Sequence, residues 1–102
     1  MKFTEKIKSL READGLTQRQ LSASLGIDVA LYNRFEKGER LMKREWVCKL
    51  AEIYGCNPND LIKCWLADKV YSVLNDEDTA SQVIAMVAEE MPEYSKSSSI
   101  TV

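Results

Sequence analysis

Histidine is absent from this chain of 102 residues, and cysteine is scarce. Without histidine, the commonest general base and metal ligand is missing, which argues against zinc sites and against nucleophiles activated by a Ser-His or Cys-His pair. The cysteines are odd in number and form no CxxC pair, so they do not make a secreted disulfide framework. They are Cys48, Cys56 and Cys64, and we expect them to be packing residues. We therefore predict no enzyme, no metal and no cofactor.

Long hydrophobic runs are also missing. No apolar stretch approaches the roughly 18 residues of a membrane span. The N-terminal stretch MKFTEKIKSLRE lacks the apolar core of a signal peptide. Both absences predict a cytoplasmic protein with no membrane partner. The content of 45% hydrophobic and 29% charged residues is that of an ordinary folded domain.

The small net charge of −2 hides an asymmetry along the chain. Residues 1–49 hold eleven positive and seven negative side chains, a net charge of +4, whereas residues 50–102 carry a net charge of −6. A basic half joined to an acidic half predicts one surface that faces a polyanion and another that avoids it. The alternative is a random scatter of charges on a solvated surface, and charge alone does not separate the two.

The stretch LTQRQLSASLGIDVALYNRFEKGER, residues 16–40, predicts two short helices separated by Gly26. Thr17 and Gln20 have the spacing of a capping box, which starts the first helix. Gly26 ends that helix, because glycine adopts the left-handed backbone of a helix C-terminus. Asp28 then caps the second helix. The chain thus interrupts one apolar pattern to make two helices at a fixed angle.

The remaining chain also has helical periodicity, and no run alternates as a strand would. The residues Thr79 and Gln82 predict a further capping box. The sequence therefore predicts an all-α fold of about six helices. Their expected positions are about 3–13, 17–25, 28–36, 43–54, 58–74 and 79–91.

Two short capped helices joined by a glycine-containing turn are typical of the helix-turn-helix, whose second helix lies in the DNA major groove. Packing between the two helices would fix their angle and leave one face of the second helix free to protrude. The residues expected to pack there are Leu21, Leu25, Ile27, Tyr32 and Phe35.

The pattern Leu16-Thr17-Gln18-x-x-Leu21-x-x-x-Leu25-Gly26-Ile27, followed by Arg34-Phe35-Glu36-Lys37-Gly38, resembles the λ-repressor/Cro-type helix-turn-helix family, often called XRE. The resemblance covers about residues 3–66. It implies a λ-repressor-like five-helix DNA-binding domain, here with an extended fifth helix and an additional C-terminal helix. It also implies a dimeric transcriptional regulator, either a repressor or a controller, that binds double-stranded DNA at an inverted-repeat operator.

The resemblance also implies roles for individual residues. The positions that would face the bases are Asp28, Val29, Ala30, Asn33 and Arg34. The positions that would contact phosphates are Gln18, Arg19, Lys37, Arg40, Lys43 and Arg44. A structural pair would join Arg11 on the first helix to Glu36.

The start of the second helix departs from the family pattern, because it is acidic or apolar where many relatives have polar side chains. Val29 and Ala30 suit thymine methyl groups, Asn33 suits a bidentate contact with adenine, and Arg34 suits guanine or a phosphate. Asp28 would repel phosphate, so we favour a capping role for it over a contact with cytosine. The alternative for Asn33 and Arg34 is that both are plain solvated residues.

Three segments follow from this interpretation. Residues 1–66 form the DNA-binding domain, residues 67–92 form a C-terminal helical extension that we expect to mediate homodimerisation, and residues 93–102 form a flexible tail. The extension is apolar on more than one side, which favours an interface between copies. The alternative is that its last helix folds back onto its own domain.

A second functional hypothesis is a protein-interaction module, such as an antitoxin or accessory subunit. No small-molecule effector is evident.

Overall fold

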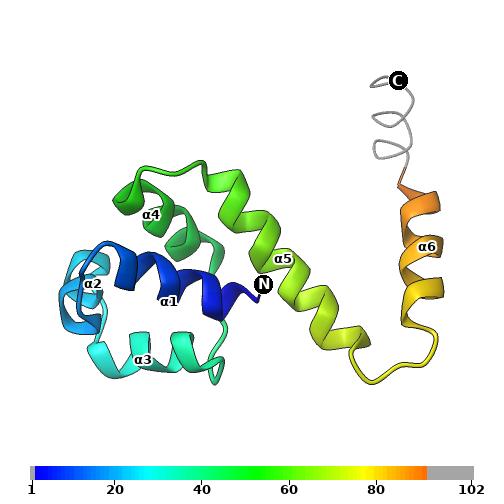
Figure 1. Ribbon diagram of the computed structural model, residues 1–102, viewed down its shortest axis with the longest axis horizontal. Helices are drawn as coiled ribbons and strands as arrows, with labels where there is room; N and C mark the ends of the chain where they lie inside the picture. The colour runs from blue at the N-terminus through cyan, green and yellow to red at the C-terminus, as the bar shows by residue number, and fades with distance from the viewer. Residues whose placement is uncertain (1, 92–102) are drawn as a thin grey trace. The chain divides into compact units, whose positions relative to one another are not determined.

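The computed structural model describes residues 2–91, which form six helices and no strand (Figure 1). The expectation of an all-α fold is confirmed. The tail predicted for residues 93–102 lies outside the described residues. The helices are α1 (Phe3–Ala13), α2 (Gln18–Leu25), α3 (Val29–Lys37), α4 (Arg44–Tyr54), α5 (Pro58–Leu74) and α6 (Ala80–Glu90).

The chain divides into two compact units, Met1–Val70 and Tyr71–Val102. The first unit contains α1 to α4 and most of α5, and the second contains the end of α5 together with α6. None of the helices in the described range has the length and apolar content needed to cross a membrane.

A single hydrophobic core joins the helices of the first unit. The indole nitrogen of Trp65 on α5 donates a hydrogen bond of 2.9 Å to the carbonyl oxygen of Met42, which fixes α5 to the segment between α3 and α4. The bond also satisfies the only polar atom of a buried indole. The core residues are Phe3, Ile7, Leu21, Leu25, Tyr32, Phe35, Met42, Val47, Leu50, Ala51, Leu61 and Trp65.

The ends of α2 and α3 follow the sequence signals. Thr17 Oγ1 accepts from Gln20 N at 3.1 Å, and Gln20 Oε1 accepts from Thr17 N at 2.9 Å, so the predicted capping box is confirmed. Asp28 Oδ2 accepts from Ala30 N at 3.1 Å, which confirms Asp28 as the cap of α3. Gly26 ends α2 with a φ of 72°, in the left-handed region that disfavours residues with a Cβ.

The capping box predicted at the start of α6 is wrong. Thr79 precedes α6, but its side chain makes no capping hydrogen bond. Its backbone, with φ −96° and ψ 14°, lies outside the extended region that aims an N-cap oxygen at the helix amides. Thr79 and Gln82 have the spacing of a capping box, but the turn before α6 does not give Thr79 the backbone conformation that a cap needs.

Candidate nucleic-acid interface

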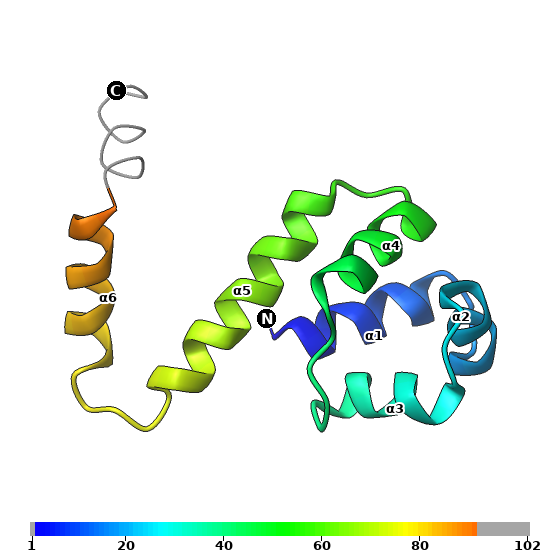
Figure 2. The same ribbon diagram turned by 180° about the vertical axis from the view of Figure 1, so that it is seen from behind.

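Helix α3 lies at the edge of the first unit. It packs against α1 and α2, and it buries Tyr32 and Phe35 in the core. In the two opposite views of Figures 1 and 2, no other helix of this unit covers the side of α3 that faces away from α1. Its core-facing side chains therefore fix its orientation and leave its outer face accessible.

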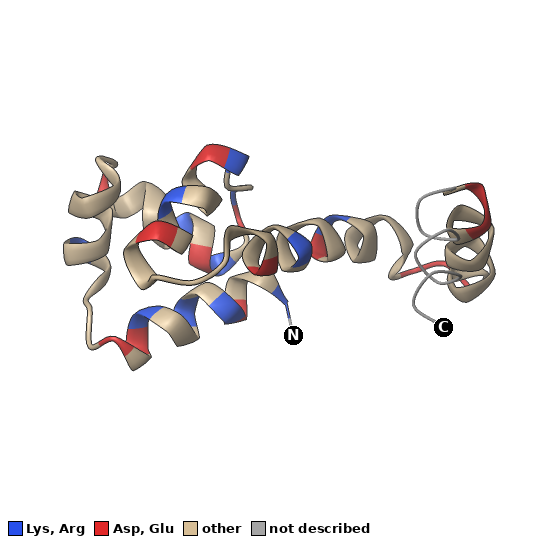
Figure 3. Cartoon of the chain, turned by 90° about the horizontal axis from the view of Figure 1, so that it is seen from above, with Lys and Arg blue, Asp and Glu red and all other residues tan. Residues whose placement is uncertain are grey.

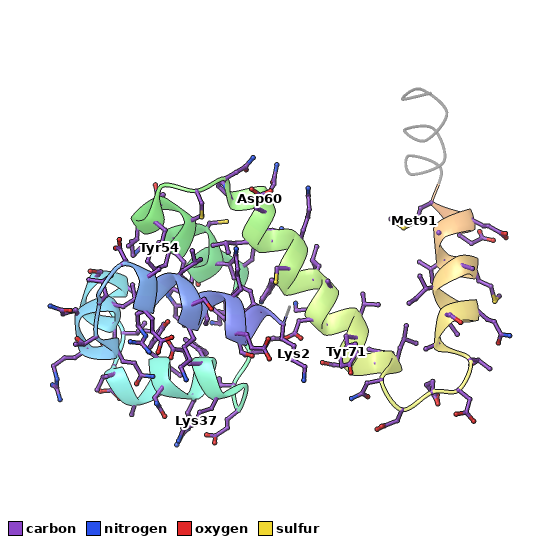
Figure 4. All side chains as sticks on the ribbon, viewed as in Figure 1. Lys2, Lys37, Tyr54, Asp60, Tyr71 and Met91 are labelled. Carbon is purple, nitrogen blue, oxygen red and sulfur yellow. The ribbon has the colours of Figure 1, made fainter. Side chains whose placement is uncertain are left out.

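The residues predicted to face the bases occupy the cap and the first turns of this helix. Asp28, Ala30 and Arg34 are exposed, while Val29 and Asn33 are half-buried. Lys37 is exposed at the last turn, and Figure 4 shows its side chain pointing away from α1. Asp28 already uses one carboxylate oxygen to cap the helix.

The residues predicted to contact phosphates lie at helix ends near α3. Gln18 and Arg19 open α2, Arg40 lies between α3 and α4, and Lys43 and Arg44 begin α4. All are exposed except Gln18, which is half-buried.

Aromatic rings position the two cations at the start of α4. Lys43 Nζ lies 5.7 Å from the centroid of the Trp46 ring, and Arg44 Cζ lies 5.3 Å from that of Trp65. Contacts of this kind are electrostatically favourable. They orient the two side chains while the charged groups stay exposed.

Positive charge is distributed unevenly among the helices. Figure 3 shows several Lys and Arg positions along α1, whereas α6 shows acidic positions and no basic one. The start of α2, the end of α3 and the start of α4 add the cations described above. In the range 2–91, no group of three His, Cys, Asp or Glu side chains could hold a metal ion.

A nearly buried ion pair ties α1 to α3. Arg11 Nε donates to Glu36 Oε2 at 2.7 Å, and Arg11 Nη2 donates to Glu36 Oε1 at 3.1 Å. The third arginine nitrogen, Nη1, donates to the carbonyl oxygen of Leu16 at 2.9 Å, just before α2. One guanidinium group thus links α1 to α3 and to the segment just before α2.

The surroundings of this pair alter the pKa values of its members. Burial by itself would raise the pKa of Glu36, but the hydrogen bonds it accepts, led by those from Arg11, outweigh burial and lower that pKa. The hydrogen bond to Glu36 raises the pKa of Arg11. Burial, followed by the adjacent Glu36 carboxylate, raises the pKa of Tyr32. At neutral pH the pair is therefore a carboxylate and a guanidinium ion.

Two amide side chains extend this network toward the outer face of α3. Gln18 Nε2 donates to Glu36 Oε1 at 3.0 Å, and Asn33 Nδ2 donates to Gln18 Oε1 at 3.0 Å. Sequence reasoning assigned Gln18 to a phosphate and Asn33 to a base, and it missed that the two side chains bond to each other. Their separation of 15 residues is not a helical spacing, so only the crossing of α2 and α3 brings them together.

A model of the helix-turn-helix domain family matches residues 3–62, more than half of the chain. The chain belongs to the helix-turn-helix domain family. The matched range contains α1 to α4 and the start of α5, and hence every residue predicted to contact DNA. The resemblance drawn from the sequence motif is thereby confirmed at the level of the family.

Two curated relatives of this helix-turn-helix protein are similar to it. A cryptic phage CTXphi transcriptional repressor RstR from Vibrio cholerae serotype O1 is 26% identical over 98 residues, covering 89% of this chain and 88% of the relative. Another RstR repressor from Vibrio cholerae is 35% identical over 60 residues, covering 59% of this chain and 54% of the relative. No solved structure matches the chain.

The family and the fold together identify a DNA-binding transcriptional regulator. In helix-turn-helix proteins the second helix of the motif reads the major groove, and here that helix is α3.

Proposed function

We propose that this protein is a transcriptional repressor that binds an inverted-repeat operator as a homodimer, with α3 of each protomer in a major groove. The observation that carries the proposal is the accessible outer face of α3, which begins at a capped first turn and rests on a buried inner face. Recognition helices of this class contact base edges mainly through their N-terminal residues.

The charged residues around α3 supply the affinity in this proposal. The N-terminus of α2 favours an anion, because its free backbone amides and helix dipole are positive, and Gln18 and Arg19 lie there. The cations that would neutralise further phosphates are Lys37, Arg40, Lys43 and Arg44. Such contacts hold any duplex, whereas contacts from Val29 to Arg34 would confer the preference for one sequence.

Two findings favour repression over other regulatory roles. Both relatives are named transcriptional repressors of a cryptic phage. The longer match covers 89% of this chain and so extends past the helix-turn-helix domain into the C-terminal helices. We place the protein in the cytoplasm as a non-enzymatic regulator with no cofactor or effector.

Dimerisation is assigned to the C-terminal helices, residues 67–92. On α6, Ile84 and Val87 follow a helical spacing and are each 53% exposed, and Met91, which directly follows the helix, is 52% exposed. Apolar side chains aligned on one helix face favour a partner surface, and a second copy gives the two-fold symmetry that an inverted repeat requires. The two recognition helices would then reach half-sites about 34 Å apart.

The same apolar face favours one other function, a protein-interaction module in which α6 binds a different protein. The two functions differ in their behaviour with DNA. A module of that kind would bind duplexes weakly and without sequence preference.

Selection of bound duplexes from a random pool tests the proposal. We expect an enriched inverted repeat, and an affinity that falls steeply with salt on every duplex while the preference for the enriched site persists. An unenriched pool, or binding that is indifferent to every duplex at low ionic strength, would overturn the proposal in favour of the interaction module.

A further inference from the structure

We propose that Glu36 is a positioning residue for base recognition: its carboxylate fixes the direction of a hydrogen-bond chain through Gln18 and thereby sets which edge the Asn33 amide presents to DNA. This inference deepens the proposed function and rests on it, because it concerns the base contacted by Asn33. We call the chain Glu36–Gln18–Asn33 the amide relay.

The first step is the carboxylate. An ionised carboxylate only accepts hydrogen bonds, so the Gln18 atom that faces it must be the amide nitrogen. If the Gln18 amide were reversed, its oxygen would face a carboxylate oxygen of Glu36 with no hydrogen between the two atoms. The Glu36 side chain is 4% exposed and that of Arg11 12%, so little water is present to compete for the carboxylate. The ion pair also keeps Glu36 charged at neutral pH.

The second step follows from the first. Because the nitrogen of Gln18 faces Glu36, its oxygen Oε1 faces Asn33 and accepts from Asn33 Nδ2 at 3.0 Å. The Asn33 amide is fixed in turn. One of its N–H groups is used inside the protein, and the other N–H together with Oδ1 remains for a ligand.

The remaining groups of Asn33 form one donor and one acceptor. Adenine is the base that presents the complementary pair in the major groove, an acceptor at N7 and a donor at N6, whereas guanine presents two acceptors. A fixed amide therefore favours adenine over guanine. If the amides of Gln18 and Asn33 were both reversed, Oδ1 of Asn33 would accept a hydrogen bond from Gln18. Asn33 would then present two N–H groups to DNA, and these suit guanine.

The substitution Glu36→Gln tests the relay, because the new side chain has almost the same shape but can donate as well as accept. The matched control is Arg11→Lys, which weakens the ion pair but leaves a carboxylate facing Gln18. A purely structural role predicts that both variants lose stability and that neither changes the base preference. The relay predicts a changed preference in Glu36→Gln alone.

The first readout needs no DNA. In ¹⁵N spectra of the full chain, we expect the side-chain amide protons of Asn33 to exchange at least several-fold faster in Glu36→Gln than in the unaltered protein, and to be unchanged in Arg11→Lys. The variant Gln18→Ala keeps the ion pair, so it remains informative if Glu36→Gln does not fold, and it should also accelerate exchange at Asn33. If the exchange rate of the Asn33 amide protons were the same in Glu36→Gln and Gln18→Ala as in the unaltered protein, the relay would be refuted.

The second readout is the affinity for paired duplexes that carry adenine or guanine at the position contacted by Asn33 in the enriched site. We expect about a tenfold preference for adenine in the unaltered protein and in Arg11→Lys, the discrimination typical of a bidentate contact. In Glu36→Gln the preference should fall below about twofold, and a preference that survives would overturn the inference. A protein that prefers no duplex would refute the proposed function instead, while the amide exchange still decides the relay.

Discussion

Glu36 is a carboxylate that the fold keeps charged while nearly burying it. Burial opposes ionisation, and the hydrogen bonds that Glu36 accepts, led by those from Arg11, reverse that effect, so the pKa of Glu36 ends below its ordinary value. A buried charge is destabilising once its partner is removed. The stability of the motif therefore depends on one arginine of α1, which also bonds to the carbonyl oxygen of Leu16.

Replacing Arg11 by methionine should lower the free energy of unfolding by roughly 3 kcal/mol at pH 7, because Glu36 is left buried and unpaired. The loss should shrink as the pH falls to about 4. In the unaltered protein Glu36 has a lowered pKa, so its stabilising effect is lost as pH falls, whereas burial in the variant raises that pKa and acid becomes favourable. Urea unfolding followed by circular dichroism measures both effects. The exposed Arg19→Met is the control, and a loss that does not change with pH would contradict the prediction.

Arg34 and Lys43 should differ in their effects on DNA binding. Arg34→Ala should weaken binding to the enriched operator by about 1–3 kcal/mol and change a scrambled duplex much less, because it removes a base contact. Lys43→Ala should weaken both duplexes alike and reduce the salt slope by about one, because it removes a phosphate contact. Fluorescence anisotropy over a range of salt concentrations measures both. Equal effects of the two variants on the two duplexes would refute the assignment.

At the scale of elements, the turn between α2 and α3 requires glycine at position 26 for its backbone conformation, and not because a side chain would clash there. Its φ is 72°, and an added Cβ would meet no heavy atom within 4 Å. Gly26→Ala should therefore lower the free energy of unfolding by only about 1–2 kcal/mol, the conformational penalty of the left-handed region, and Gly26→Asn by less.

Gly55 after α4 provides the matched control for this turn. Its φ is 65° and the space around its Cβ position is equally open, so Gly55→Ala should cost a similar amount. Thermal unfolding of both variants makes the comparison. A much larger loss for Gly26→Ala would show that the helix-turn-helix angle itself is disturbed.

The helices could be predicted from the sequence because their signals are local. Capping residues, terminal glycines and apolar spacing lie within a few residues of the ends they define, and the starts of α2 and α3 are where the signals placed them. The expected capping box at Thr79 failed because a cap also needs an extended backbone, which the preceding turn does not supply. Local residue types predict a helix more reliably than the conformation of the turn before it.

The candidate site was predictable as a set of positions but not as a network. The outer face of α3 follows from helical periodicity once Tyr32 and Phe35 are placed in the core. The bond between Gln18 and Asn33 depends on the angle and distance between two helices, which no spacing within one helix contains. For the same reason the sequence could not show that Asn33 has one N–H already in use.

At the scale of the whole molecule, charge and apolar surface are divided along the chain. Positive side chains concentrate in residues 1–49, and α6 carries glutamates and no cation. Exposed apolar side chains of the C-terminal part include Val73 at 75%, Ile84 and Val87 on α6, and Met91 directly after it. This division suits a protein that binds a polyanion through one part and a second copy through another.

The double variant Ile84→Glu with Val87→Glu tests the role of α6 in dimerisation. Both side chains are exposed, so the helix should tolerate the change, while two charges on the apolar face should repel a second copy. We expect light scattering to give the mass of a dimer for the unaltered protein and of a monomer for the variant. The affinity for the full operator should fall at least about 100-fold while that for a single half-site stays the same, because the second contact is no longer intramolecular. The control, Gln82→Glu with Ala85→Glu, adds the same charge to the opposite face of α6 and should remain dimeric. If Ile84→Glu with Val87→Glu left the mass unchanged, this face of α6 would not be the dimer interface.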